Sequence, residues 1–339
     1  MERELIFRLV TVAASMVVTF GLTCAVMTVL LPVLRKYKLN QPISIYAPKS
    51  HNAKGATPTL GGLAFVIAST VTVLILSVVF FVKGMGRELL PLLFSFGLGL
   101  GNAAIGFVDD YRKLVKRNNV GLRAWQKFLL QLIVAAIYLV LMVRLGGMTT
   151  AIHIPYFDVT LDLGIFTYVI AILLITGMAN STNLTDGVDG LLSSTAAVVA
   201  CFLLSAALMH EDTVSAILPS LVIGSVLAFL LYNAHPAKVF MGDTGSLFIG
   251  SIFVGTAFLL DEPLIVLVAG GIYVVETASV ILQVFSCKLI RLKLRKKRFF
   301  LRTPIHHHFE DKGYRENQIV IAFTLVSVVF CLFAWLGVL

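Results

Sequence analysis

Ten long apolar segments constrain this chain more than any other feature of its sequence. A helix needs about 20 largely apolar residues to cross the hydrocarbon core of a bilayer, and the chain offers such a stretch ten times. Of its 339 residues, 58% are hydrophobic and only 13% are charged, which leaves too few polar side chains to cover a water-facing surface. The sequence therefore excludes a soluble globular enzyme and a disordered chain, and it predicts an all-α, polytopic integral membrane protein.

The predicted spans follow one another along the chain, and no fixed repeat or low-complexity tract interrupts them. We therefore expect a single transmembrane domain over residues 1–339. The ten spans are Leu9–Leu34, Pro58–Val82, Leu89–Val108, Gln126–Leu145, Gly164–Met178, Leu191–Met209, Ala216–Tyr232, Ser246–Leu260, Leu264–Cys287 and Gln318–Leu339.

Lys and Arg residues collect in the loops after the first, third, fifth, seventh and ninth spans. The opposite side of the membrane receives few, chiefly Arg3, Arg8, Lys83, Arg87 and Arg144. Because cytoplasmic loops of membrane proteins are enriched in Lys and Arg, we expect the odd loops to lie in the cytoplasm and both termini to lie outside. The same rule accounts for the net charge of +9 without a nucleic-acid partner.

Five polar blocks stand out against the apolar background, and each lies in or beside one of the odd loops. They cover residues 50–62, 106–113, 180–190, 233–246 and 302–310. The chemistry of the protein is therefore predicted to take place in loops on the cytoplasmic side.

Adjacent carboxylates end the third span, at Asp109 and Asp110. Carboxylates at the edge of the membrane are unfavourable unless they face water, a metal or a cationic partner. A function is favoured for this pair. The alternative is that the two carboxylates neutralise Arg112 and Lys113 at the interface.

Two further blocks combine carboxylates with glycines. Asp186 and Asp189 are three residues apart, so on one helical turn they would share a face. Gly242 and Asp243 open the eighth span, where free backbone N–H groups favour an anion and a carboxylate favours a hard cation. For the second of these blocks, a plain turn with an aspartate cap is the alternative.

Lys54 and a run of three histidines add donors. Lys54 offers a mobile charge for a phosphate; the alternative is that its block is a helix cap and that Lys54 only extends to the membrane interface. Consecutive residues diverge by about 100° on a helix, so the histidines are expected to bind phosphate or sugar oxygens and not one zinc ion. The cysteines stand singly in apolar stretches, which excludes a disulfide framework. The histidines are His306, His307 and His308. The cysteines are Cys24, Cys201, Cys287 and Cys331.

Two further features lie inside the spans. Glu276 lies near the middle of the ninth span, where a carboxylate is either functional or paired with a polar group of a neighbouring helix. Gly97 and Gly101, spaced as G-x-x-x-G, are expected to allow close helix packing.

The carboxylates and amides together form an oxygen-rich set that suits magnesium better than a soft metal. Phosphate donors beside such a set, at a membrane surface, indicate phosphoryl transfer between a soluble nucleotide and a lipid. The set consists of Asp109, Asp110, Asp186, Asp189, Asp243, Asn183 and Asn233.

The polar blocks resemble those of the polyprenyl-phosphate N-acetylhexosamine-1-phosphate transferases, in the same order from His51 to Glu310. The resemblance lies in SHNAKGATPTLGG, GFVDDYRK, NSTNLTDGVDGL, NAHPAKVFMGDTGSL and TPIHHHFE. Departures at Ala56, Leu60, Val188 and Thr244 remove no charged or amide group. Within this family, the last block favours the branch that handles phospho-N-acetylmuramoyl-pentapeptide.

This resemblance implies transfer of phospho-MurNAc-pentapeptide from its UDP carrier to undecaprenyl phosphate, with formation of lipid I and UMP in peptidoglycan synthesis. It also implies a Mg²⁺ cofactor and a homodimer in the bacterial plasma membrane. A single direct attack on the β-phosphorus is favoured over a covalent enzyme intermediate, because a phosphate monoester is already largely dianionic at neutral pH.

The resemblance assigns roles residue by residue. Asp243 is expected to bind the metal, and Asp109 and Asp110 to orient or deprotonate the lipid phosphate. His306, His307 and His308 are expected to bind the sugar-phosphate end. The remaining expected substrate-binding residues are Lys54, Thr59, Asn183, Asp186, Asp189, Asn233, Gly242 and Ser246.

Two alternative functions remain at this point. A sister class transfers GlcNAc-1-phosphate from UDP-GlcNAc to the same lipid, although the TPIHHHFE block argues against it. An ion-coupled transporter is the other, prompted by Glu276 and the many acidic residues, but transporters keep coupling carboxylates near the bilayer midplane, whereas nearly all of these lie at helix ends.

Overall fold

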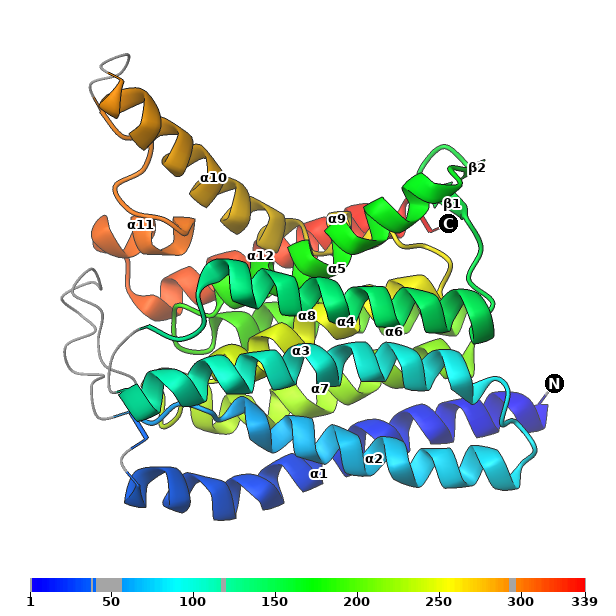
Figure 1. Ribbon diagram of the computed structural model, residues 1–339. Coiled ribbons are helices and arrows are strands. Elements are labelled where there is room, and N and C mark those ends of the chain that lie inside the picture. The colour runs from blue at the N-terminus through cyan, green and yellow to red at the C-terminus, as the bar shows by residue number, and fades with distance from the viewer. Residues whose placement is uncertain (1, 38, 41–56, 117–119, 293–296, 339) are drawn as a thin grey trace.

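The computed structural model describes residues 2–37, 39–40, 57–116, 120–292 and 297–338, and helices dominate it (Figure 1). Among these residues, ten helices are long and apolar enough to cross a membrane, as the sequence predicts. They are α1 (Glu2–Lys36), α2 (Gly62–Val82), α3 (Leu89–Lys116), α4 (Ala124–Leu145), α5 (Ile165–Thr185), α6 (Leu191–Met209), α7 (Thr213–Asn233), α8 (Gly242–Leu259), α10 (Gly271–Arg291) and α12 (Glu316–Trp335). The shorter elements are β1 (Ala151–Ile154), β2 (Val159–Asp162), α9 (Ile265–Ala269) and α11 (Ile305–Asp311).

The ninth predicted span, Leu264–Cys287, is wrong as one continuous helix. It divides at Gly270 into the short α9 and the long α10. Two adjacent glycines lower helix stability at this point, and the ring of Phe330 fills the space where a side chain at Gly271 would lie, since a Cβ there would come within 2.4 Å of that ring. In Figure 1, α10 angles away from the other helices, with α11 beside it.

A small sheet is the other departure from the predicted all-helical chain. β1 and β2 form an antiparallel hairpin, in which Ala151 faces Asp162 and Ile154 faces Val159. Most of β2 is exposed, so the hairpin is a connection between α4 and α5 and contributes little to the core.

The centre of the bundle consists of α7 and α8. Within their membrane windows, 78% and 83% of the residues are buried inside the protein, against 28% for α1, α4 and α12. The outer helices expose large apolar side chains such as Val17 and Leu129, as expected where lipid is the solvent. The first turn of α8 is therefore held at a central position, surrounded by other helices.

Glycines bring the backbones of neighbouring helices into direct contact. A Cβ at Gly106 of α3 would lie 2.3 Å from the carbonyl oxygen of Asp243 in α8. Gly101 packs closely against the side chain of Val134 in α4, as predicted. Gly97 has no neighbour within 4 Å, so its predicted packing role is wrong, because its position on α3 is exposed while the adjacent Leu98 and Gly99 are buried.

Both termini lie at one end of the bundle, and α11 and the C-terminal ends of α1, α3 and α10 lie at the other (Figure 1). This arrangement agrees with an even number of crossings. The polar blocks that the structure describes lie at the second end, at the C-terminal ends of α3, α5 and α7 and the N-terminal end of α8.

Substitution of Gly106 by alanine is expected to destabilise the protein, because the added methyl group would force α3 away from the backbone of α8. Overpacking of this kind costs about 1–3 kcal/mol. The midpoint of thermal unfolding in detergent should fall by several degrees, while Gly97→Ala on the same helix should leave it unchanged. Equal midpoints for the two variants would contradict the close α3–α8 contact.

Candidate active site

Three carboxylates from distant parts of the chain meet at one end of the bundle. Asp109 and Asp110 extend from the C-terminal part of α3, and Asp243 from the first turn of α8. One oxygen atom from each lies within 4.8 Å of the others. The side chains of Asp109 and Asp110 are 5% and 1% exposed, so three negative charges are gathered in a largely buried place.

Asp110 stabilises the start of α8. Its carboxylate accepts hydrogen bonds from the backbone N–H groups of Asp243, at 3.2 Å, and Thr244, at 3.1 Å, and from the hydroxyl of Thr244, at 3.0 Å. These N–H groups have no partner inside their own helix, and Met241, which precedes α8, offers no side-chain cap. Asp110 therefore caps α8 from another helix.

Two lysines neutralise most of this charge. The Nζ atom of Lys113 lies 2.6 Å from Asp109 and 3.3 Å from Asp243, and that of Lys127 lies 2.9 Å from Asp243. Lys113 thus fulfils the neutralising role considered from the sequence. Lys127 was not predicted from the sequence to belong to the site. The only indication in the sequence was that it is a cation in the first turn of an apolar span. Three carboxylates against two ammonium groups leave one negative charge in excess.

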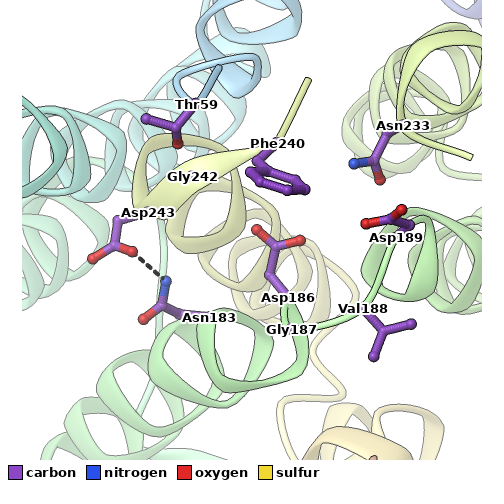
Figure 2. A pocket seen from close by; sticks show the side chains of 10 residues that line it. All are labelled: Thr59, Asn183, Asp186, Gly187, Val188, Asp189, Asn233, Phe240, Gly242 and Asp243. Carbon is purple, nitrogen blue, oxygen red and sulfur yellow. Dashed lines mark hydrogen bonds between the residues drawn. The ribbon is translucent and has the colours of Figure 1, made fainter. Parts of the chain in front are cut away.

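Asn183, in the last turn of α5, connects a third helix to the cluster. Its side-chain N–H₂ donates to Asp243, at 3.0 Å, and to the hydroxyl of Ser246, at 2.8 Å, while its oxygen accepts from Lys127, at 3.2 Å. Figure 2 shows the Asn183–Asp243 bond at the edge of a pocket. Ser246 is fully buried behind Asn183 and supports this amide.

The pocket beside the cluster brings together six of the expected substrate-binding residues. It is lined by Thr59, Asn183, Asp186, Gly187, Val188, Asp189, Asn233, Phe240, Gly242 and Asp243. In Figure 2 the carboxylate of Asp186 lies between Asn183 and the ring of Phe240. The hydroxyl of Thr59 is buried without a hydrogen-bond partner among the described residues, which fits a group that binds a ligand. Lys54 lies outside the described residues.

Asp186 and Asp189 do not share a helical face, so that prediction is wrong. α5 ends at Thr185, and residues 186–190 form turns that end at Gly190, whose φ of +76° favours glycine. Burial and repulsion from Asp243, Asp110 and Asp189 raise the pKa of Asp186 to about 8. A cation in the pocket would relieve this repulsion.

Asp189 and Asn233 hold the far wall of the pocket together. Asp189 binds the Nδ1 atom of His235 and the backbone N–H of Ala237, both at 3.0 Å. The oxygen of Asn233 accepts from the N–H of Gly190, at 3.1 Å, and its amide N–H donates to the carbonyl of Val239, at 3.0 Å. Both ends of the Asn233 side chain therefore hold protein backbone in this structure.

The three histidines lie on the short helix α11, and each binds a different partner, although the ring centroids of His306 and His307 are only 4.1 Å apart. Nδ1 of His306 pairs with Glu276, at 2.9 Å, and Nδ1 of His307 pairs with Glu310, at 2.5 Å. Nδ1 of His308 accepts from the backbone N–H of Leu301, at 3.1 Å. His306 is fully buried and lies behind Gly187, since a Cβ on that glycine would come within 2.2 Å of its Nε2 atom.

Comparison with known proteins identifies the family of this chain. The pattern of Glycosyl transferase family 4 matches residues 91–261. A phospho-N-acetylmuramoyl-pentapeptide-transferase of Bacillus cytotoxicus is 42% identical over 311 residues, covering 91% of this chain and 92% of the relative. The chain belongs to this transferase family. The corresponding transferase of Clostridium kluyveri is 38% identical over 323 residues, covering 95% of this chain and 98% of the relative.

Membership of the phospho-N-acetylmuramoyl-pentapeptide-transferase family agrees with the resemblance seen in the polar blocks. The Glycosyl transferase family 4 match contains Asp109, Asp110, Lys113, Lys127 and Asp243, so the whole charged cluster lies within it. The pocket and the cluster together therefore form the candidate active site of a phosphoglycosyl transferase.

Substitution of Asp110 by alanine is expected to lower both stability and activity, because it removes the carboxylate that caps α8 beside Asp243. Loss of a helix cap costs about 0.5–2 kcal/mol. Asp212 is a matched control, since it caps α7 by accepting from Val214 and Ser215 in the loop between α6 and α7, at the opposite end. Asp212→Ala should lower the unfolding midpoint alone. Equal loss of transfer activity in both variants would contradict a local role for Asp110.

Proposed function

We propose that the protein transfers phospho-MurNAc-pentapeptide from its UDP carrier to undecaprenyl phosphate, forming lipid I and releasing UMP. The observation that carries this proposal is the charged cluster, in which three carboxylates and two lysines converge beside a pocket at one end of a membrane-spanning bundle. The names of the relatives support a phospho-N-acetylmuramoyl-pentapeptide as the transferred group.

Mg²⁺ is the proposed cofactor, held by Asp243 with help from Asp109 and Asp110. The donor set fits, because the three carboxylates offer only hard oxygen atoms within 4.8 Å of one another. The ammonium group of Lys113 lies within 3.9 Å of all three, which identifies the place as one where a cation is stable. When bound, the ion would neutralise charge on the pyrophosphate.

The pocket residues would hold the nucleotide. The ring of Phe240 lines the pocket, and stacking of a base on an aromatic ring contributes about 1–3 kcal/mol in other proteins. Lys113 and Lys127 would contact phosphate oxygens, with Asn183 and Thr59 as uncharged partners. Asp189 and Asn233 would shape the wall behind the nucleotide, and, as the family resemblance implies, the histidines of α11 would lie towards the sugar-phosphate end.

A single displacement at phosphorus is the proposed mechanism. An oxygen of the lipid phosphate attacks the β-phosphorus, the bond from that phosphorus to the bridging oxygen breaks, and UMP leaves with the bonding electrons. The attacking phosphate is already largely dianionic at neutral pH, so no general base is required. Asp109 would then orient the lipid through Lys113, which it holds at 2.6 Å.

We further propose that the site faces the cytoplasm of a bacterial cell and that both termini lie outside. The uneven distribution of Lys and Arg supports this orientation, and so does the position of both termini at the end opposite the site (Figure 1). A homodimer is also proposed, on the family resemblance alone.

The two alternative functions have less support. The relatives are named for the pentapeptide substrate and not for GlcNAc-1-phosphate. Glu276, which prompted the transporter, is paired with His306. Asp109, Asp110 and Asp243 lie towards helix ends, and Asp186 and Asp189 lie in the turn after α5, so none of these carboxylates is at the bilayer midplane.

Transfer is tested by release of radiolabelled UMP from purified protein with undecaprenyl phosphate. UDP-MurNAc-pentapeptide should react and UDP-GlcNAc should not, and EDTA should stop the reaction until Mg²⁺ is restored. Asp243→Asn should lower the rate by about 10²–10³-fold, the usual effect of losing one charge-stabilising group.

Asp158→Asn is the control for this experiment, because Asp158 is a fully exposed carboxylate between the strands of the hairpin. It should behave like the wild type. If Asp243→Asn keeps full magnesium-dependent turnover, the metal assignment is wrong, and equal reaction with UDP-GlcNAc would overturn the proposed substrate.

Orientation is tested by single cysteines in a variant that lacks Cys24, Cys201, Cys287 and Cys331. An impermeant maleimide should label Asp158→Cys in intact cells, because the hairpin lies at the end of the termini (Figure 1). Lys312→Cys, after α11, should be labelled only after permeabilisation. The reverse pattern would place the site outside the cell.

Stereochemistry separates the two mechanisms. With a chirally labelled β-phosphorus, one displacement inverts the configuration, whereas two displacements through a covalent intermediate retain it. We expect inversion, analysed by ³¹P NMR of the lipid product, and net retention would refute the direct attack.

A further inference from the structure

A buried hydrogen bond between a carboxylate and an imidazole connects α10 to α11 behind the pocket. The carboxylate of Glu276 and the Nδ1 atom of His306 are 2.9 Å apart, and both side chains are fully buried. Burying an ionisable group inside a membrane protein costs free energy, so a buried carboxylate of this kind is a candidate for a functional role. The mechanism proposed above makes no use of Glu276.

This pair fixes the orientation of the His306 ring. Because Nδ1 donates its proton to the carboxylate, Nε2 lies at the opposite side of the ring. Nε2 has no hydrogen-bond partner among the described residues, and it points at Gly187, where a Cβ would lie 2.2 Å away from it. Only glycine fits between the ring and the pocket at this point.

Gly187 belongs to the pocket wall, whereas His306 does not. The glycine thus separates the imidazole from the cavity, and the ring supports the segment from Asp186 to Asp189 from behind. This segment has no helical hydrogen bonding to hold it, since α5 ends at Thr185. The ring therefore lies against the turn that carries the two pocket carboxylates, Asp186 and Asp189, which Figure 2 shows from the pocket side.

α10 braces the chain before α11 at a second point. The side-chain amide of Gln283 donates to the carbonyl of Phe300, at 2.9 Å, and accepts from its N–H, at 3.1 Å. Glu276, Ser279, Gln283 and Ser286 are all buried, and their spacing of three, four and three residues places them on one face of the helix. This polar face is directed at α11 and its preceding loop.

We propose that Glu276 is a positioning residue for the transfer reaction. Through His306 it holds the Asp186–Asp189 segment against the nucleotide. This inference rests on the proposed function, because it assumes that the pocket binds the nucleotide part of the substrate.

The first test compares Glu276→Ala with a matched control at the other end of the bundle. Glu262 is a second buried glutamate, paired with the Nδ1 atom of His153 at 2.6 Å. A misplacement of about 1 Å in a site can cost about a hundredfold in rate. Glu276→Ala should therefore raise the KM for the UDP substrate and lower the rate of UMP release at least tenfold (about 1.4 kcal/mol), with the KM for undecaprenyl phosphate unchanged.

Glu262→Ala should retain wild-type kinetics. Glu276→Gln should recover part of the activity, because its amide oxygen can still accept the proton of Nδ1. Wild-type kinetics in Glu276→Ala, or equal losses in the two alanine variants, would overturn the proposal.

A double-mutant cycle tests whether Glu276 acts through His306. If it does, Glu276→Ala in a His306→Ala background should cause no further loss of activity. If the activity losses caused by the two single substitutions multiply in the double variant, the two residues act separately and the proposal is wrong.

A stability cycle tests the contact with Gly187 without relying on catalysis. Gly187→Ala should lower the unfolding midpoint by several degrees, and the same change in a His306→Ala background should lower it by much less. Equal shifts in both backgrounds would overturn the proposed support of the loop. Absence of UMP release by the wild type would instead refute the proposed function, whatever the outcome of this cycle.

Discussion

The hydrogen bonds from the start of α8 to the carboxylate of Asp110 hold the site together. They join the most deeply buried helix of the bundle to α3 at the place where Asp243 begins its turn. The absence of a side chain at Gly106 allows the two backbones to approach there. A capping interaction and a close helix contact thus place two of the three carboxylates relative to the third.

Two lysines, one on α3 and one on α4, complete this arrangement. Lys113 lies one turn after Asp109 on α3, and Lys127 lies in the first turn of α4. The Oδ1 atom of Asp109 also accepts from the backbone N–H of Leu122, at 2.6 Å, which holds the connection between α3 and α4 against the cluster. A mixed cluster of this kind can exchange an ammonium contact for a metal or phosphate contact without burying an isolated charge.

The sequence predicted the spans well because hydropathy over about 20 residues is a local property. It predicted α6 at Leu191–Met209 and nine other crossings, and it placed the polar blocks between them. It missed the division at Gly270, since glycine also occurs inside continuous spans here, as at Gly97 and Gly101. A helix break of this kind depends on what packs beside it.

Side-chain pairs that form across the bundle cannot be predicted from a single sequence either. Lys127 reaches Asp243 across 116 positions, and Glu276 reaches His306 across 30. The acidic blocks were recognisable because charged residues are rare in an apolar chain. Their individual partners were not, and neither was the turn that separates Asp186 from Asp189, which depends on the conformation of Gly190.

The order of the helices along the chain has a consequence for biogenesis. α8 is among the least apolar of the ten crossing helices, and it is the most enclosed by protein, so lipid alone is a poor environment for it. Its partners α3 and α5 are made earlier by the ribosome, and the carboxylate that receives its first N–H groups is already present when α8 enters the membrane. The helices that pack against α8 and the carboxylate that caps it are thus synthesised before α8 itself.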